Sequence, residues 1–229
     1  MYQQAEDMKT TENIDVNCIE PQYEYQGLVS TIHPPDYWRN LDSSKSRTKQ
    51  EEEAGKRIIL DLLNNQPSNS AVAFTDGSCS GNPRPCGSGA IIFHKEEEIE
   101  LKRAVSNRGS ILPAEIIAIK IVLDYFVNSK DQELHNITIF PDSQSALGIL
   151  TLNWKSDNYF QSINEIKSQI NYLKEQGVVV SFNWTPGHAS IKGSEIADQL
   201  AKGAAKEAET LELSTQVFTK KTSEKLQGM

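Results

Sequence analysis

Short apolar runs alternate with longer amphipathic segments from residue 71 onward. Each run of about six apolar residues is typical of a buried strand, whereas apolar residues three or four positions apart indicate helices. Strands are expected at 71–76, 88–94, 99–105, 136–142 and 178–184. Helices are expected from Pro113, over 143–154, over 157–176 and over 194–209. This order, βββαβααβα, predicts an α/β fold with a five-stranded mixed sheet and helices on both faces.

The chain before residue 70 follows a different pattern. Residues 1–43 show no regular periodicity, and 46–64 read as one helix with Ile59 on its apolar face. The sequence QPSNS at 66–70 interrupts this helix and indicates a boundary. We therefore expect an N-terminal extension over 1–69, a domain over 70–209 and a polar tail over 210–229. The extension could be the end of a preceding domain, a linker or an arm that docks a partner.

Composition narrows the class of protein. No apolar stretch approaches the roughly 20 residues of a membrane span, and the acidic N-terminus resembles no signal peptide, so an intracellular location is expected. The net charge of −8 argues against non-specific nucleic-acid binding through a basic face. Cys18, Cys79 and Cys86 lack the further Cys or His ligands of a zinc site, and we expect them as reduced thiols.

Two acidic residues directly follow apolar runs. Asp76 and Asp142 are expected to end their strands, with Gly77 turning the chain away and Ser143 capping the next helix. A right-handed crossover between these strands makes them parallel neighbours. Because ligands bind at the carboxyl ends of adjacent parallel strands, the two carboxylates should meet.

Two further acids lie on apolar helix faces. Glu115 is in the first turn of the crossover helix, and Asp198 is flanked by apolar residues in the last helix. Each acid alone has a simple structural explanation, such as a turn, a helix cap, the helix dipole or an ion pair between Asp198 and Lys202. Four inward carboxylates together need cations, and two divalent ions with oxygen ligands would neutralise them.

Four sequence blocks carry a family resemblance. The segments TDGSCSGNP, AEIIAIKIVL, FPDSQSALGIL and WTPGHASIKGSEIADQLAKGAA occur in order over about residues 71–206. They resemble the ribonuclease H family, and most closely the ribonuclease H domains of reverse transcriptases in non-long-terminal-repeat retroelements. The resemblance implies a ribonuclease H-like fold and a magnesium-dependent endonuclease. Such an enzyme cuts the RNA strand of an RNA–DNA hybrid and leaves 5′-phosphate and 3′-hydroxyl ends.

The resemblance also implies catalytic residues. Asp76, Glu115, Asp142 and Asp198 match the family's metal-binding tetrad, which holds two Mg²⁺ ions, with Mn²⁺ as a substitute. One ion is expected at Asp76 and Asp198, where it activates water. The other is expected at Asp76, Glu115 and Asp142, where it stabilises the leaving oxygen. His188 matches the histidine that assists proton transfer and product release.

Candidate substrate contacts follow from the same alignment of motifs. Ser78, Gly81, Asn82 and Gln144 match positions that touch the minor groove of the hybrid and its 2′-hydroxyls. Arg84 stands where relatives often have glycine and is expected to contact phosphate. Ordinary turn chemistry explains Ser78 and Asn82 almost equally well.

Besides Arg84, the chain departs from relatives in this family at Ser194, where asparagine is common, before the glutamate, and between the two middle helices. The polar pair that precedes the glutamate is missing, with Ser110 a weak substitute, and no basic helix lies between the two middle helices. We therefore expect weak, salt-dependent affinity for RNA–DNA hybrid, with a reverse transcriptase or another polypeptide supplying the rest.

Two other functions were considered. A catalytically silent domain that binds nucleic acid or acts as a scaffold remains the alternative, although such domains usually lose an acid. A 3′–5′ exonuclease needs two acids in one strand, as D-x-E, and Asp76 has no such neighbour.

Overall fold

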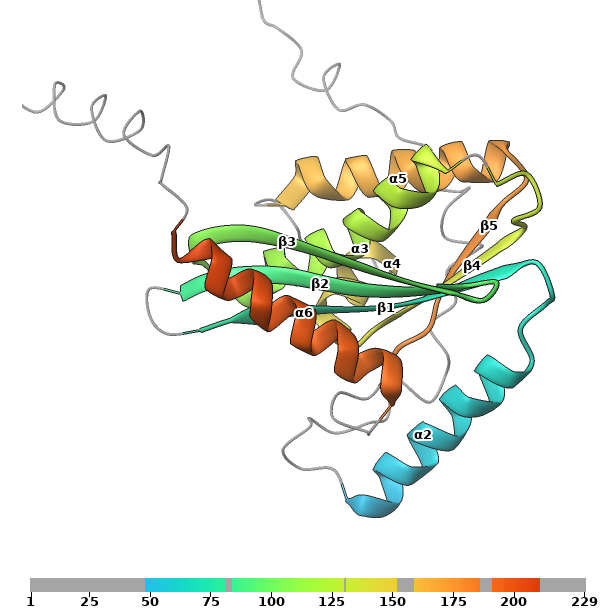
Figure 1. The fold of residues 1–229 in the computed structure, drawn as a ribbon, viewed down its shortest axis with the longest axis horizontal. Coiled ribbons are helices and arrows are strands. Elements are labelled where there is room, and N and C mark those ends of the chain that lie inside the picture. The colour runs from blue at the N-terminus through green and yellow to red at the C-terminus, as the bar shows by residue number, and fades with distance from the viewer. Residues whose placement is uncertain (1–47, 81–83, 130, 152–158, 186–190, 211–229) are drawn as a thin grey trace, which may run out of the picture.

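A mixed sheet forms the centre of the molecule (Figure 1). A computed structural model describes residues 48–80, 84–129, 131–151, 159–185 and 191–210. The strand order is β3-β2-β1-β4-β5, in which β1, β2 and β3 are antiparallel neighbours and β4 and β5 run parallel to β1. The strands are β1 (Ser70–Cys79), β2 (Arg84–His94), β3 (Glu97–Gly109), β4 (Asn136–Pro141) and β5 (Val179–Phe182). The five-stranded mixed sheet expected from the sequence is confirmed.

Helices cover both faces of this sheet, as expected. One face packs against α3 (Ile111–Asn128), α4 (Gln144–Thr151) and α5 (Phe160–Glu175). The other face carries α6 (Lys192–Ala208), with α2 (Lys49–Asn64) beside it (Figure 1). Among the described residues, none of the helices combines the length and apolarity that a membrane span requires.

The core on the α3 face is built from β-branched and leucine side chains. Ile119 and Val122 of α3, Ile139 of β4 and Ile166 of α5 are all fully buried. This packing follows the expected periodicities, because alternate strand residues face the helices and every third or fourth helical residue faces the sheet. Burial of this apolar surface is the main stabilising contribution to the fold.

The opposite face brings α6 very close to β2. Ala201 and Ala204 of α6 are fully buried, and they lie over glycines of the strand. A β-carbon at Gly87 would lie 2.2 Å from the backbone nitrogen of Ala205, and one at Gly89 would lie 2.3 Å from a backbone atom of α6. The alanine-rich last helix therefore packs against the strand at a distance that only glycine permits.

The helix α2 packs against the same face, next to α6. Its Ile59 is fully buried with Phe74 of β1 and Phe140 of β4, whose rings stack 5.0 Å apart. Just after the helix, the side-chain oxygen of Gln66 accepts a hydrogen bond of 3.0 Å from the hydroxyl of Thr138. The expected helix over 46–64 is thus present over Lys49–Asn64 and contributes to the core.

The first strand is longer than the sequence suggested. The expectation that Asp76 ends the strand is wrong, because β1 continues through Gly77 and Ser78 to Cys79. Antiparallel pairing with β2 continues over these residues, with Asp76 opposite Gly89. Parallel pairing with β4 ends earlier, at Thr75 and Pro141. Asp76 therefore follows the end of the β1–β4 ladder rather than the end of its strand.

The cysteine expectation also needs correction. Cys79 and Cys86 form a disulfide rather than two reduced thiols. They are the last paired residues of the β1–β2 ladder, so their side chains lie opposite each other. This pairing depends on strand register, which the seven-residue spacing alone does not reveal.

Candidate active site

The two central parallel strands bring two carboxylates to the same edge of the sheet. The β1–β4 register ends at Thr75 and Pro141, and the next residues are Asp76 and Asp142. Directly after Asp142 the chain enters α4, and the hydroxyl of Ser143 accepts a hydrogen bond of 3.2 Å from the backbone N–H of Ala146. The cap expected at Ser143 is confirmed, and it directs the chain away just behind the carboxylate.

The third carboxylate, Glu115, comes from the first turns of α3. This helix approaches β1 so closely that a β-carbon at Gly77 would lie 2.6 Å from the backbone nitrogen of Glu115. On the neighbouring strand, the buried hydroxyl of Ser88 donates a hydrogen bond of 2.6 Å to the carbonyl of Ala114. Gly77 therefore allows the close approach of α3, instead of turning the chain as the sequence suggested.

Three of the four predicted acids meet. Ligand oxygens of Asp76, Glu115 and Asp142 all lie within 4.8 Å of one another. They open into a cavity of about 250 Å³. The described residues that line it are Asp76, Gly77, Glu115, Asp142, Ser194, Glu195 and Asp198.

The proximity of these acids disfavours their ionisation. Burial, together with the charges of Asp142 and Asp198, raises the pKa of Asp76 from 3.8 to about 8. The residue as a whole is only 8% exposed. A hydrogen bond from the Gly77 backbone lowers the pKa and offsets part of this effect. A carboxyl with these surroundings becomes a good ligand when a cation replaces its proton.

Glu115 provides the clearest sign of a cation site. Burial raises its pKa well above the usual value, and the charges of Asp142 and Asp76 act in the same direction. Its Oε2 atom is buried and has no hydrogen-bond partner among the residues that the structure describes. Buried carboxylate oxygens normally have partners, so this arrangement is costly for the protein alone. A set of carboxylate oxygens fits a hard divalent ion such as Mg²⁺.

Asp198 approaches the cluster from α6, on the other face of the sheet. It lines the cavity and interacts with the Asp76 carboxyl. Its Oδ2 atom also lies 2.6 Å from Nζ of Lys202, one turn along the helix. With 31% of its side chain exposed, Asp198 is more accessible than Asp76 and Glu115, which are both buried. The expected ion pair between Asp198 and Lys202 is therefore present, and Asp198 also lines the carboxylate cavity.

The cavity also contains residues that the sequence analysis did not select as site residues. Ser194 and Glu195 line it from the first turn of α6. The sequence could have predicted Glu195 as a site residue, because a residue three positions before Asp198 lies on the same side of a helix. Glu195 is exposed, so it adds negative charge at the solvent side of the cavity.

Trp184 fixes the backbone beside Asp142. Its indole N–H donates a hydrogen bond of 2.9 Å to the Asp142 carbonyl, and its side chain is almost fully buried. The backbone N–H of Thr185 bonds to the carbonyl of Pro141 at 3.0 Å. The chain after β5 therefore extends the contact with β4 up to the acid.

The predicted substrate contacts are only partly visible. Ser78 is half-buried in β1, Arg84 is exposed at the start of β2, and Gln144 is half-buried at the start of α4. None of these three lines the carboxylate cavity. The remaining predicted residues lie outside the described part of the chain: Gly81, Asn82 and His188.

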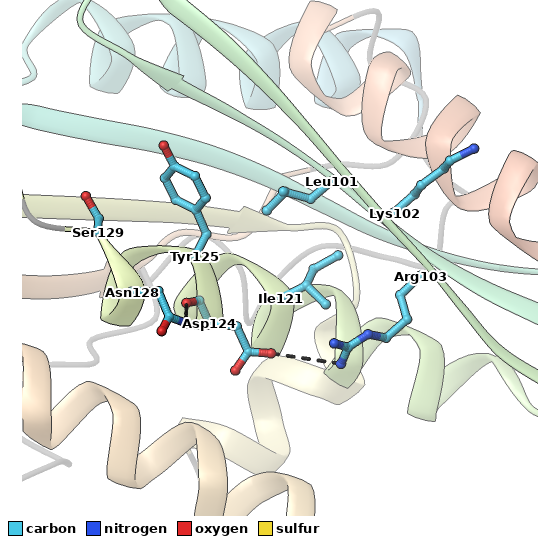
Figure 2. Close-up of a pocket in the computed structure, with 8 residues that line it drawn as sticks. All are labelled: Leu101, Lys102, Arg103, Ile121, Asp124, Tyr125, Asn128 and Ser129. Atoms are coloured by element: carbon cyan, nitrogen blue, oxygen red, sulfur yellow. Dashed lines mark hydrogen bonds and ion pairs between the residues drawn. The ribbon is translucent and has the colours of Figure 1, made fainter.

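A second cavity, of about 460 Å³, lies between β3 and the C-terminal half of α3 (Figure 2). Asp124 is the only acid among the described residues that line it, and Arg103 lies 3.9 Å away from it. The backbone carbonyl of Asp124 also accepts a hydrogen bond of 2.7 Å from Asn128. Its acid is already paired, and this cavity lacks the clustered carboxylates of the first one. We therefore place the candidate active site at the cavity lined by Asp76, Glu115 and Asp142.

Comparison with known proteins identifies the family of the segment that carries this cavity. The family model for RNase H matches residues 68–206. Ribonuclease HI of Haemophilus influenzae (strain Rd) is 32% identical over 151 residues, which cover 61% of this chain and 91% of that protein. Ribonuclease HI of Pasteurella multocida is 30% identical over 143 residues, which cover 58% and 87%.

Solved structures were compared as well. The N-terminal RNase H domain from Mycobacterium tuberculosis, solved as a fusion protein, is 21% identical with a TM-score of 0.47, covering 59% of this chain and 98% of that one. RNase H1 from Halobacterium salinarum is 22% identical with a TM-score of 0.43, covering 61% and 99%. The family assignment rests on the sequence matches, whose span includes all four acids. On this basis the chain belongs to the ribonuclease H family of hydrolytic enzymes.

Proposed function

We propose that this protein hydrolyses the RNA strand of RNA–DNA hybrids at the carboxylate cavity. The observation that carries the proposal is the meeting of Asp76, Glu115 and Asp142 within 4.8 Å, inside the segment that matches the family. The relatives' name, ribonuclease H, supplies the substrate class. The alternative of a catalytically silent domain is not favoured, because all four acids of the motif are present.

Two divalent cations are part of this proposal. It is supported by the buried Glu115 oxygen, which has no hydrogen-bond partner among the described residues, and by the raised pKa of Asp76. Asp76, Glu115 and Asp142 would hold one ion, and Asp76 with Asp198 the other. When bound, such ions lower the pKa of an attacking water and stabilise the leaving oxygen. Products with 5′-phosphate and 3′-hydroxyl ends are expected.

The protein's own side chains have separate roles in this proposal. Gly77 and Ser88 hold β1 and β2 against α3, which keeps the acids in place. His188 is proposed to move a proton during the reaction and to assist product release, since an imidazole titrates near neutral pH. Contacts to the minor groove and phosphate are proposed for the residues named above: Ser78, Gly81, Asn82, Arg84 and Gln144.

We also propose that the isolated chain binds hybrid weakly. Its net charge of −8 repels phosphate, so affinity should depend strongly on salt. A reverse transcriptase or another polypeptide would then supply affinity, in keeping with the likeness to retroelement domains in the sequence motifs. A salt titration of hybrid binding tests this idea, because an affinity unaffected by salt would contradict it.

Cleavage of a labelled hybrid is the direct test of the proposed activity. Each strand would carry a different label, and reactions would contain Mg²⁺, Mn²⁺ or a chelator. We expect cuts in the RNA strand only, and only with a divalent ion. The ends of the products would be identified by their response to phosphatase and ligase.

Matched controls make the result interpretable. Asp142→Asn keeps the side-chain shape and removes the charge, so it should abolish cleavage while the protein stays folded. Single-stranded RNA, double-stranded RNA and double-stranded DNA should remain intact. If the folded wild-type chain leaves hybrid uncut with both metals, even beside a polymerase partner, the proposed activity is wrong and the silent domain is favoured.

A further inference from the structure

The disulfide between Cys79 and Cys86 closes the β1–β2 hairpin near the carboxylate cavity. Its two residues form the last pair of the antiparallel ladder, three positions beyond Asp76. One further backbone hydrogen bond, of 3.0 Å from Ser80 N–H to the Pro85 carbonyl, lies beyond it. The disulfide therefore lies between the acids and the connection that joins the two strands.

Three helix contacts hold this hairpin on the Asp76 side of the disulfide. On one face, Gly77 contacts the backbone of α3 and Ser88 bonds to the Ala114 carbonyl at 2.6 Å. On the other face, Gly87 lies against the backbone of α6. These three contacts surround the strand pairs next to Asp76. The position of Asp76 thus depends on helix packing and not on the disulfide.

Arg84 lies beyond these helix contacts and depends much more on the disulfide, whereas Ser78 lies at their edge, opposite Gly87. Ser78 is half-buried and Arg84 is exposed, and both flank the cysteines. They are also proposed substrate contacts. Arg84 is paired in the ladder only with Gly109 of β3, across a register shift at Cys86. A covalent link between the strands at this point therefore restrains the side chains that would face substrate.

Access to the two sulfurs is unequal. Cys79 is half-buried, whereas Cys86 is fully buried and packs next to Gly109. An external thiolate can therefore approach Cys79 but not Cys86. Thiol–disulfide exchange requires attack along an open path at one sulfur, and this geometry selects Cys79.

We propose that Cys79–Cys86 is a redox-sensitive disulfide that controls the affinity for RNA–DNA hybrid without altering the metal site. This inference rests on the proposed function for its substrate. The reductant is a protein or small molecule with two neighbouring thiols. The oxidised form, which the structure shows, is the form in which Ser78 and Arg84 are restrained by the covalent link.

The exchange is balanced in two steps. A thiolate of the reductant attacks Cys79 Sγ, the Cys79–Cys86 bond breaks, and Cys86 leaves as a thiolate that takes up a proton. The second thiol of the reductant then attacks the first reductant sulfur, which is bonded to Cys79 in the mixed disulfide. Cys79 is released as a thiolate and takes up a proton. The protein gains two electrons and two protons, and the reductant becomes a disulfide.

The first test counts thiols and needs no enzymatic activity. In a Cys18→Ser background, Cys79 and Cys86 are the only cysteines of the chain. After unfolding without reductant, an alkylating reagent should add no label, and after treatment of the folded protein with a dithiol it should add two. Two labels without reductant would overturn the proposal, and so would a folded protein that resists the dithiol.

The second test measures affinity in both redox states. Asp142→Asn in the same background would bind fluorescent hybrid without cutting it. Reduction should weaken binding by about 2- to 10-fold, the effect of releasing one or two ordered side chains at an interface. The active protein should show the same change in KM with an unchanged kcat and an unchanged Mg²⁺ requirement. Equal affinity in both states, or a loss confined to kcat, would refute the proposal.

A variant provides the control for reagent effects. Cys79→Ser with Cys86→Ala should behave like the reduced protein and should not respond to dithiol. If no form of the chain binds hybrid, even beside a polymerase partner, the proposed function fails and the substrate part of this inference fails with it. The thiol count still decides separately whether the disulfide exists and can be reduced.

Discussion

Replacement of Asp76 by asparagine should stabilise the protein when divalent ions are absent. Burial raises the pKa of this carboxyl to about 8 in the folded state, against 3.8 in an unfolded chain. Between these values the folded protein keeps a proton that the unfolded chain has lost. Stability therefore falls as pH rises from about 4 to 8, and the loss is complete above pH 8.

The magnitude follows from the pKa shift. One pKa unit corresponds to about 1.36 kcal/mol, so the contribution of Asp76 to unfolding free energy should fall by about 4 kcal/mol between pH 5 and pH 8. The residue as a whole is 8% exposed, so solvent screening is small. Asparagine has nearly the same shape and no charge, and it removes this dependence. The change also relieves Glu115, whose pKa the Asp76 charge helps to raise.

Urea unfolding at several pH values, with a chelator, measures this effect. The variant should be more stable than the wild type at pH 8, and the advantage should shrink towards pH 5. Excess Mg²⁺ should narrow the difference at pH 8, because binding to the folded wild type at 100 times the dissociation constant adds about 2.7 kcal/mol. Glu100→Gln is the matched control, since Glu100 is exposed on β3 and its removal should change little. An advantage that is the same at pH 5 and pH 8 would refute the reasoning.

Three other substitutions test the packing around the site. Gly77→Ala places a β-carbon 2.6 Å from the Glu115 backbone, so unfolding by urea should show a loss of about 1–3 kcal/mol and calorimetry should show weaker Mn²⁺ binding. Trp184→Phe removes the N–H that bonds to Asp142, and about 1–3 kcal/mol of stability should be lost with a higher Mg²⁺ requirement. Ile59→Ala opens a space under α2 and should cost about 2–5 kcal/mol in the same urea assay.

Two variants serve as controls for these experiments. Gly203→Ala in α6 meets nothing within 4 Å, so it should leave metal binding unchanged and stabilise the helix by about 0.5–1 kcal/mol. Leu60→Ala affects a side chain that is 43% exposed and should cost far less than Ile59→Ala. If Gly77→Ala and Gly203→Ala have the same unfolding free energy and the same Mn²⁺ affinity, the close approach of α3 is not needed for stability or metal binding. If Ile59→Ala matches Leu60→Ala, α2 does not belong to the core.

Local sequence was sufficient for the elements and for the acids. Apolar periodicity predicted the order of strands and helices, because burial of one face imposes a period of two on strands and 3.6 on helices. Asp142 was placed correctly at the end of its strand, since Ser143 begins the next helix with a cap. Both features involve residues within a few positions of each other in the chain.

Only the tertiary structure decided the features that depend on distant partners. Strand β1 continues past Asp76 because β2 pairs with it, and the same register brings Cys79 opposite Cys86. Gly77 serves the close packing of α3 rather than a turn. A local sequence pattern does not predict where a partner strand or helix will lie, because strand register is set by the whole sheet.

For the active site too, the sequence predicted some features and the tertiary structure decided others. The sequence by itself determined which residues carry negative charge on apolar faces, namely Asp76, Glu115, Asp142 and Asp198. The tertiary structure decided that the carboxylates of three of them meet within 4.8 Å. It also decided that Asp198 lies beside them while it is ion-paired with Lys202. The reason is physical: charge and burial are properties of a residue and its neighbours in the chain. The distance between carboxylates is instead set by helix packing on opposite faces of one sheet.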